Sequence, residues 1–147
     1  MVDAPDLHRP VDGRPVEATQ RLDGITVLVV DDELDACEAV RRVLEHRGAV
    51  VYAAASAAEA LNVLPDLRPH VLVADLAMPE SDGYDLIKRV RRCTPGVGLP
   101  AVALTALVGS ARETALQAGF EMYESKPILA DDLVSLVARL ADGSRAV

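Results

Sequence analysis

The sequence has few aromatic residues and no tryptophan, since its 147 residues include three tyrosines and one phenylalanine. Half of the residues are nevertheless hydrophobic, so small and aliphatic side chains dominate. A chain of this length can bury roughly two-thirds of the surface that it exposes when unfolded. This composition fits a single α/β domain and excludes a disordered or fibrous chain.

Cysteine is also scarce, because only Cys37 and Cys93 are present, and neither lies in a CxxC or Cys/His spacing. The sequence therefore predicts no zinc site and two free thiols buried in helices. No run reaches the roughly 18 apolar residues that a membrane span needs, so no membrane partner is expected. The N-terminal stretch MVDAPDLHRP has no apolar signal core. The expected location is a reducing cytoplasm.

Basic residues are fewer than acidic ones, which gives a formal net charge of −8. Such an acidic surface does not favour nonspecific binding to a phosphate backbone, so direct nucleic-acid binding is not predicted. Residues 1–22 carry three of the nine prolines, mixed charges and no periodicity, which predicts a flexible tail or linker. We expect one domain over 23–142 and a short C-terminal tail over 143–147.

Two patterns alternate along the rest of the chain. Continuous apolar, β-branched runs predict strands that are covered on both faces. Amphipathic patterns between them predict helices, and five strands alternating with five helices predict a doubly wound parallel sheet in the order 2-1-3-4-5. The strands are expected at 25–30, 49–54, 70–75, 100–105 and 119–125, and the helices at 34–46, 56–64, from Asp82 to before Pro95, at 110–118 and after Asp131 or Asp132.

Local signals set the expected limits of the helices. Ser56 with Glu59 three residues later is a capping box, and Pro65 is expected to follow the end of that helix. Gly48 can close the first helix, and Gly143 with a short tail is expected to follow the last one. The first helix should place one apolar stripe against the core, formed by Leu34, Cys37, Val40, Val43 and Leu44.

Acidic and polar side chains stand where the predicted strands end. Asp31 and Asp32 follow the first strand, Asp75 ends the third, Thr105 ends the fourth and Lys126 follows the fifth. In doubly wound sheets, ligands bind beyond the carboxyl ends of the strands, where the strand order reverses. Three carboxylates that share a pocket there repel each other, which favours a hard divalent cation such as Mg²⁺. Asp75 can then act as a nucleophile in phosphoryl transfer, with Lys126 and Thr105 at the phosphoryl oxygens.

Four motifs resemble, in order and spacing, the CheY-like receiver domains of bacterial two-component response regulators. They are VVDDE (29–33), ADLAMPESDGYDLI (74–87), ALTA (103–106) and YESKP (123–127). The resemblance covers about residues 24–141. It implies a flavodoxin-like α/β fold and a phosphorylation-controlled switch whose only catalysis is phosphotransfer to itself and autodephosphorylation.

The resemblance also implies a role for each matched residue. Asp75 corresponds to the phosphoacceptor, which is phosphorylated by a histidine kinase or a histidine phosphotransfer protein. Thr105 and Tyr123 correspond to the switch pair, whose movement changes the partner-binding face of the fourth helix, fifth strand and fifth helix. Lys126 corresponds to the lysine that contacts the phosphoryl group, and its bond to Pro127 is expected to be cis. The implied Mg²⁺ ligands are Asp31, Asp32, Asp75 and the backbone carbonyl of Ala77.

Other interpretations stay open from the residues alone. The acids after the first strand can also be caps or first-turn residues of the next helix. Two enzyme or carrier classes are not favoured. A phosphatase of the haloacid dehalogenase type needs a second aspartate where Ala77 stands, and a flavodoxin-type flavin carrier is excluded because the acidic run DDELD would repel the phosphate that its first loop must bind. A pseudo-receiver that only binds partners, and a receiver domain cut from a hybrid histidine kinase, both fit the sequence.

Overall fold

One parallel sheet of five strands forms the centre of the molecule. The computed structural model describes residues 20–77, 83–93, 98–106 and 111–145. The strands are arranged in the order β2-β1-β3-β4-β5, and all neighbouring pairs are parallel, which confirms the predicted doubly wound sheet. Their bounds are β1 Thr26–Val30, β2 Val50–Ala54, β3 Val71–Ala74, β4 Ala101–Thr105 and β5 Met122–Ser125.

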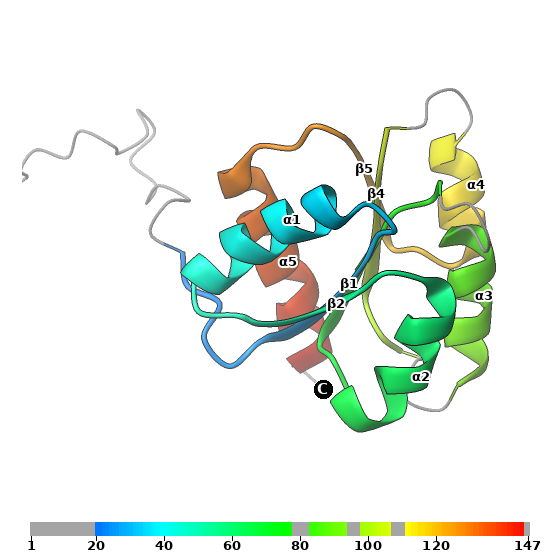
Figure 1. Cartoon of the computed structure of the whole chain (residues 1–147), viewed down its shortest axis with the longest axis horizontal. Helices are drawn as coiled ribbons and strands as arrows, with labels where there is room; N and C mark the ends of the chain where they lie inside the picture. The colour runs from blue at the N-terminus through cyan, green and yellow to red at the C-terminus, as the bar shows by residue number, and fades with distance from the viewer. Residues whose placement is uncertain (1–19, 78–82, 94–97, 107–110, 146–147) are drawn as a thin grey trace, which may run out of the picture.

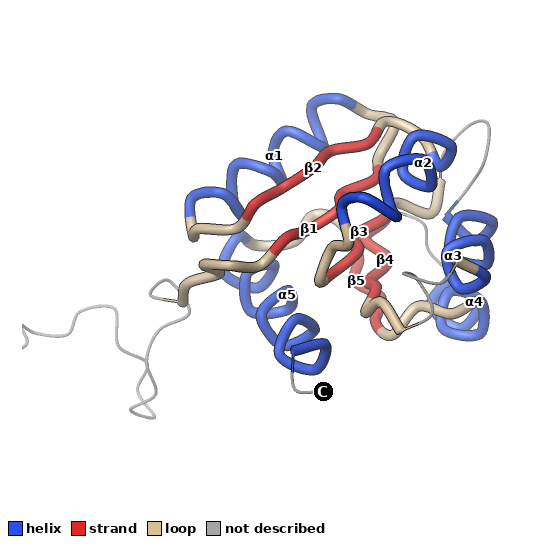
Figure 2. The backbone as a smooth tube through the Cα atoms, turned by 90° about the horizontal axis from the view of Figure 1, so that it is seen from below, coloured by secondary structure: helices blue, strands red, loops and turns tan. Residues whose placement is uncertain are grey.

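The helices form two layers, one on each face of the sheet (Figures 1 and 2). α1 (Leu34–His46) and α5 (Ala130–Arg145) cover one face. α2 (Ala57–Leu67), α3 (Gly83–Arg92) and α4 (Ala111–Ala118) cover the other. Within the described part of the chain, no helix combines the length and the apolar character that crossing a bilayer requires.

Because helices cover both faces of the sheet, the side chains of its strands pack in two separate hydrophobic cores. In β1, Val27 and Val29 pack with α1 and α5, whereas Leu28 and Val30 pack with the opposite layer. Successive strand residues point to opposite faces, so a run that is apolar throughout supplies both cores at once. We call these the α1–α5 core and the α2–α4 core. This arrangement explains why the strand runs are continuous rather than alternating.

The apolar stripe of α1 begins later than the sequence predicts. Leu34 is 74% exposed, whereas Cys37 and Leu44 are buried and Val40 and Val43 are partly buried. Leu34 is the first residue of α1, and α1 begins beyond the carboxyl end of β1 (Figure 1). The stripe prediction is therefore wrong for this residue and correct from the second turn onward.

α2 keeps the predicted cap but continues past the predicted end. Ser56 Oγ accepts a hydrogen bond from the Glu59 N–H at 3.1 Å, which confirms the N-cap. Pro65 lies inside the helix, which ends at Leu67, so the expectation that it follows the helix is wrong. A proline in the last turn removes only one N–H from the ladder. The Arg68 N–H still bonds a carbonyl of the preceding turn at 3.0 Å and closes the helix.

α5 differs from expectation at both ends. It begins at Ala130, so Asp131 and Asp132 lie in its first turn and neither is the cap. Acids in the first turn interact favourably with the helix dipole, which accounts for their position. The helix passes through Gly143 and ends at Arg145, because one glycine costs a helix only about 1 kcal/mol. The expected cap Asp82 and the stop Pro95 lie outside the described residues, and the domain limits 23 and 142 stay predictions.

The residues just before β1 are tied to the domain. Leu22 is fully buried in the α1–α5 core, and its N–H donates to the Arg47 carbonyl at 2.6 Å. The Arg47 guanidinium, whose side chain is 12% exposed, bonds the Gln20 carbonyl at 3.1 Å and Asp131 Oδ1 at 2.7 Å. This arginine therefore joins the chain before β1 to the end of α1 and the start of α5.

Candidate functional site

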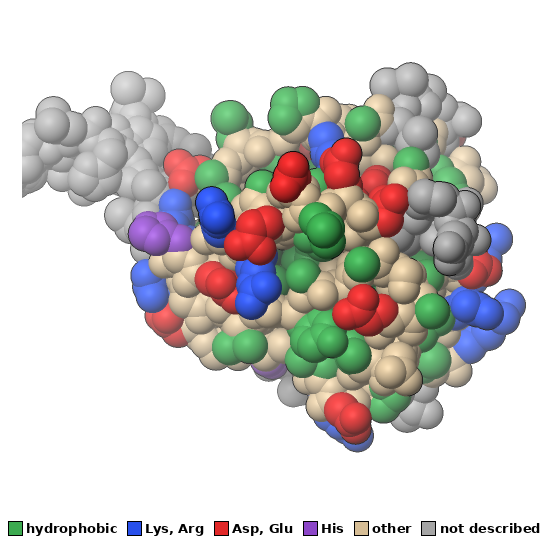
Figure 3. All heavy atoms as spheres, in the orientation of Figure 1, with side chains coloured by type: hydrophobic (Ala, Val, Ile, Leu, Met, Phe, Trp, Pro, Cys, Tyr) green, Lys and Arg blue, Asp and Glu red, His purple; other side chains and the backbone are tan. Residues whose placement is uncertain are grey.

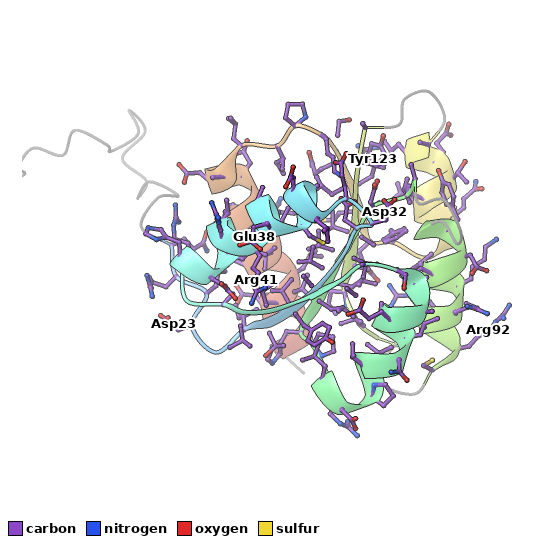
Figure 4. The ribbon with its side chains drawn as sticks, viewed as in Figure 1. Asp23, Asp32, Glu38, Arg41, Arg92 and Tyr123 are labelled. Carbon is purple, nitrogen blue, oxygen red and sulfur yellow. The ribbon has the colours of Figure 1, made fainter. Side chains whose placement is uncertain are left out.

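The predicted acidic and basic residues meet in one pocket beyond the carboxyl ends of the strands. The pocket has a volume of about 410 Å³. In Figure 4, Asp32 lies where β1 ends and α1 begins, while Asp23 lies at the opposite end of β1. The sheet thus places the site at the edge predicted from the chain order. The lining residues are Asp31, Asp32, Glu33, Asp75, Ala77, Thr105, Ala106 and Lys126.

The three aspartates converge because the sheet's hydrogen bonds continue past the strand ends. The Asp31 N–H donates to the Ala54 carbonyl at 3.1 Å, and the Asp75 N–H donates to the Val30 carbonyl at 2.9 Å. One carboxylate oxygen from each of Asp31, Asp32 and Asp75 lies within 4.8 Å of the others. Asp31 is buried, Asp75 is partly buried and Asp32 is exposed, so the cluster runs from the interior to the surface. Acidic side chains are also visible around the start of α1 in Figure 3.

Asp31 is the best-bonded acid of the cluster. Its Oδ1 accepts from the Glu33 N–H at 2.9 Å, and its Oδ2 accepts from Lys126 Nζ at 2.8 Å. Lys126 Nζ lies farther from Asp75, at 3.8 Å from Oδ2. The lysine therefore pairs chiefly with Asp31, whereas the sequence associates it with a phosphoryl group on Asp75.

The backbone of Lys126 is also held in place. Its N–H donates to the Thr105 carbonyl at 2.9 Å, which ties the end of β5 to the end of β4. The peptide bond between Lys126 and Pro127 is cis, as expected.

The charge of Lys126 is set by its neighbours. Burial acts to lower the pKa of its ammonium, but the hydrogen bond that it donates to Asp31 and the charges of Asp31, Asp75 and Glu33 outweigh burial and raise that pKa above its usual value. One ammonium stands against four carboxylates in the pocket lining. The pocket is therefore strongly negative and favours a further cation.

The donor set fits Mg²⁺. Every candidate ligand atom is a carboxylate or carbonyl oxygen, which hard divalent cations prefer. Two oxygens on opposite sides of Mg²⁺ are about 4.2 Å apart, because each bond is about 2.1 Å long. The 4.8 Å limit on the aspartate oxygens is close to that separation. Ala77 also lines the pocket, and its N–H donates to Asp75 Oδ1 at 3.3 Å, so its backbone stays beside the cluster.

The two predicted switch residues occupy different places. Thr105 has no solvent-exposed surface, and it lines the inner wall of the pocket at the end of β4. Tyr123 is 9% exposed, belongs to the α2–α4 core and is opposite Ala103 on β4. It does not line the pocket. Their predicted role as a pair that moves stays a prediction.

The set of site residues predicted from the sequence leaves out three residues near the pocket. Glu33 contributes a fourth carboxylate and could have been included from the acidic run DDE. Ala106 follows Thr105 directly and lines the same pocket. Cys37 Sγ donates to the Asp31 carbonyl at 3.3 Å, a contact that no spacing rule indicates because it depends on how α1 packs. Burial and the nearby Asp31 charge raise the pKa of this thiol from 9.0 to about 11. Cys93, predicted to be buried, is only partly so.

A doubly wound sheet with an acid cluster and a cis-proline-linked lysine at its carboxyl edge defines a CheY-like signalling domain. The family model of the response regulator receiver domain matches residues 27–138. The chain therefore belongs to the receiver domain family of two-component systems, which confirms the resemblance. Receiver domains interact with kinases and with downstream partners in general.

Curated relatives and solved structures agree with this assignment. An uncharacterized 14.6 kDa protein of Leptolyngbya boryana is 45% identical over 119 residues, which are 80% of this chain and 91% of that protein. Response regulator MprA of Mycobacterium ulcerans is 35% identical over 79% of this chain, which spans about half of the length of MprA.

Two solved structures illustrate the likeness of the fold. A protein described as a response regulator of Chloroflexus aurantiacus is 36% identical with a TM-score of 0.76, over 80% of this chain and 97% of that one. The receiver domain of a signal transduction histidine kinase of Syntrophus aciditrophicus is 28% identical with a TM-score of 0.77, over 84% of this chain and 95% of that one.

Proposed function

We propose that the domain is a switch that accepts a phosphoryl group on Asp75 in a Mg²⁺-dependent reaction with a histidine kinase or a histidine phosphotransfer protein. The observation that carries this proposal is the convergence of three aspartates, one lysine and one threonine in a single pocket. A structural role alone does not require four carboxylates around one ammonium, because like charges this close destabilise the fold.

The reaction is a displacement at phosphorus. An oxygen of the Asp75 carboxylate forms a bond to the phosphorus of a phosphohistidine, the P–N bond breaks, and its electron pair stays on the histidine nitrogen. When Mg²⁺ is bound, it supplies positive charge to the phosphoryl oxygens. Asp31, Asp32, Asp75 and the Ala77 carbonyl would hold the metal, and Lys126 adds a second positive charge beside Asp75.

The aspartyl phosphate is then the signal. Thr105 ends β4 at the pocket and supplies a hydroxyl for the new phosphoryl group, while Tyr123 changes its packing in the neighbouring strand. We expect these changes to alter the face formed by α4, β5 and α5, which binds the downstream protein. Hydrolysis of the aspartyl phosphate by the domain itself ends the signal. The domain acts in the cytoplasm and does not bind nucleic acid directly.

The test is phosphorylation by acetyl phosphate, a small-molecule donor, followed by intact mass. The wild-type chain should gain one phosphoryl group only when Mg²⁺ is present. Asp75→Asn should gain none, whereas the control Asp66→Asn, which changes an acid on α2 away from the pocket, should behave as wild type.

Beryllofluoride, which mimics a phosphoryl group on an aspartate, distinguishes the switch from a pseudo-receiver. The switch proposal is refuted, and a pseudo-receiver remains, if the folded wild-type chain gives two negative results. Acetyl phosphate adds no mass to it, and a beryllofluoride titration does not change its NMR spectrum. A receiver domain that belongs to a hybrid kinase would give the same chemistry. It is a second context to consider because the Syntrophus domain of similar structure comes from a histidine kinase.

A further inference from the structure

The start of α3 lies directly against the backbone of the acceptor residue. The Gly83 N–H, at the first position of α3, donates to the Leu76 carbonyl at 3.0 Å. A Cβ at position 83 would lie 2.5 Å from the Asp75 carbonyl oxygen, 2.9 Å from Leu76 Cα and 3.1 Å from the Asp75 carbonyl carbon. The helix thus touches the peptide bond that follows Asp75.

This contact leaves no room for a side chain. Close contacts between a carbon and a carbonyl oxygen are about 3.3 Å long, so a Cβ would overlap the Asp75 oxygen by about 0.8 Å. The atoms that it meets are backbone, which cannot turn away as the end of a flexible side chain can. The overlap can be relieved only if α3 or the Asp75–Leu76 peptide moves.

Neither of these is free to move without changing its neighbours. On the sheet side, the Asp75 N–H is bonded to the Val30 carbonyl at 2.9 Å. On the helix side, Leu86 and Ile87 of α3 are fully buried in the α2–α4 core, and Leu76 is 1% exposed. The backbone of Asp75 is therefore fixed on both sides. Its N–H is hydrogen-bonded to β1, and its carbonyl group is in contact with the start of α3.

We propose that Gly83 is a positioning residue for the phosphoacceptor, because its missing side chain lets α3 set the Asp75–Leu76 peptide and with it the direction of the Asp75 carboxylate. The inference rests on the proposed function for its rate measurement but not for its structural measurement. Displacements of about 1 Å at reacting groups can slow a reaction by about 100-fold. We expect Gly83→Ala to slow Mg²⁺-dependent phosphorylation by acetyl phosphate roughly 10-fold to 100-fold per folded molecule.

Two control variants separate positioning from a general loss of stability. Gly98→Ala adds the same methyl group at an exposed glycine that has nothing within 4 Å of the new Cβ, so its rate should stay within about twofold of wild type. Val137→Ala removes a fully buried side chain from the α1–α5 core, so it should lower stability and leave the rate per folded molecule unchanged. A Gly83→Ala rate equal to that of Gly98→Ala overturns the proposal.

A second measurement does not depend on phosphorylation. The backbone amide resonances of Asp75 and Ala77 should shift in Gly83→Ala, while that of Thr26, at the opposite end of β1, should stay close to its wild-type position. Unchanged Asp75 and Ala77 resonances overturn the proposal even if the wild-type chain accepts no phosphoryl group. If Gly83→Ala does not fold in buffer, both measurements are made in trimethylamine oxide, which favours the folded state, and the same outcomes decide.

Discussion

The Cys37 thiol makes stability depend on pH above neutrality. Cys37 is 5% exposed, and burial together with the Asp31 charge raises its pKa from 9.0 to about 11. In the unfolded chain this thiol loses its proton near pH 9, whereas in the folded chain it keeps the proton until about pH 11. The free energy of unfolding should therefore fall as the pH rises between these values. A pKa difference of two corresponds to about 2.7 kcal/mol.

The assay is urea unfolding at several pH values from 8 to above 11, compared between wild type and Cys37→Ala in a Cys93→Ser background. Alanine removes the titrating group, and the cost of the smaller side chain does not depend on pH. Other titrating groups contribute equally to both chains, so they cancel in the difference. The stability advantage of wild type over Cys37→Ala should shrink by about 2.7 kcal/mol across this range. A difference that stays constant with pH would refute the assignment of a buried, protonated thiol.

Three further predictions follow from individual contacts. Lys126→Met should tighten Mg²⁺ binding about tenfold in calorimetry, because the charge-assisted hydrogen bond that occupies Asp31 contributes about 1.5 kcal/mol; unchanged affinity would show that lysine and metal do not compete. Leu64→Ala empties a fully buried position in the α2–α4 core and should lower the free energy of unfolding by about 3 kcal/mol in urea titrations; a loss below about 1 kcal/mol would contradict that packing. Ser56→Ala removes the N-cap of α2 and should lower the free energy of unfolding by about 1 kcal/mol, whereas Ser56→Asn keeps a capping side chain and should not lower it. Equal losses of stability in the two variants would show that the cap is unimportant.

The fold was largely predictable because its signals are local. Each strand is an apolar run between two helical patterns, and the Ser56 cap depends on residues three apart. The exposed Leu34 and the internal Pro65 were not predictable in this way. The exposure of Leu34 depends on how α1 packs as a whole rather than on its spacing in the apolar stripe. The last turn of α2, around Pro65, is supported by Leu64 and Leu67, which pack in the α2–α4 core.

The composition of the site follows from topology, whereas its pairings do not. Parallel strands deliver their last residues to one edge, so Asp31, Asp75 and Lys126 had to meet once the strand order was known. The choice of Asp31 over Asp75 as the main partner of Lys126 depends on about 1 Å of side-chain placement, the difference between 2.8 and 3.8 Å. The contact of Gly83 with the Asp75 peptide likewise depends on how closely α3 packs.

The sheet that separates the α1–α5 core from the α2–α4 core also limits how far the effect of a core substitution spreads. A substitution that alters volume at Val27 is felt among α1 and α5, and one at Leu28 is felt among the helices of the other layer. Pairs of substitutions on opposite sides share few partners, so their effects should add. Each layer can therefore be redesigned or can diverge on its own, while the edge that holds the aspartates stays the same.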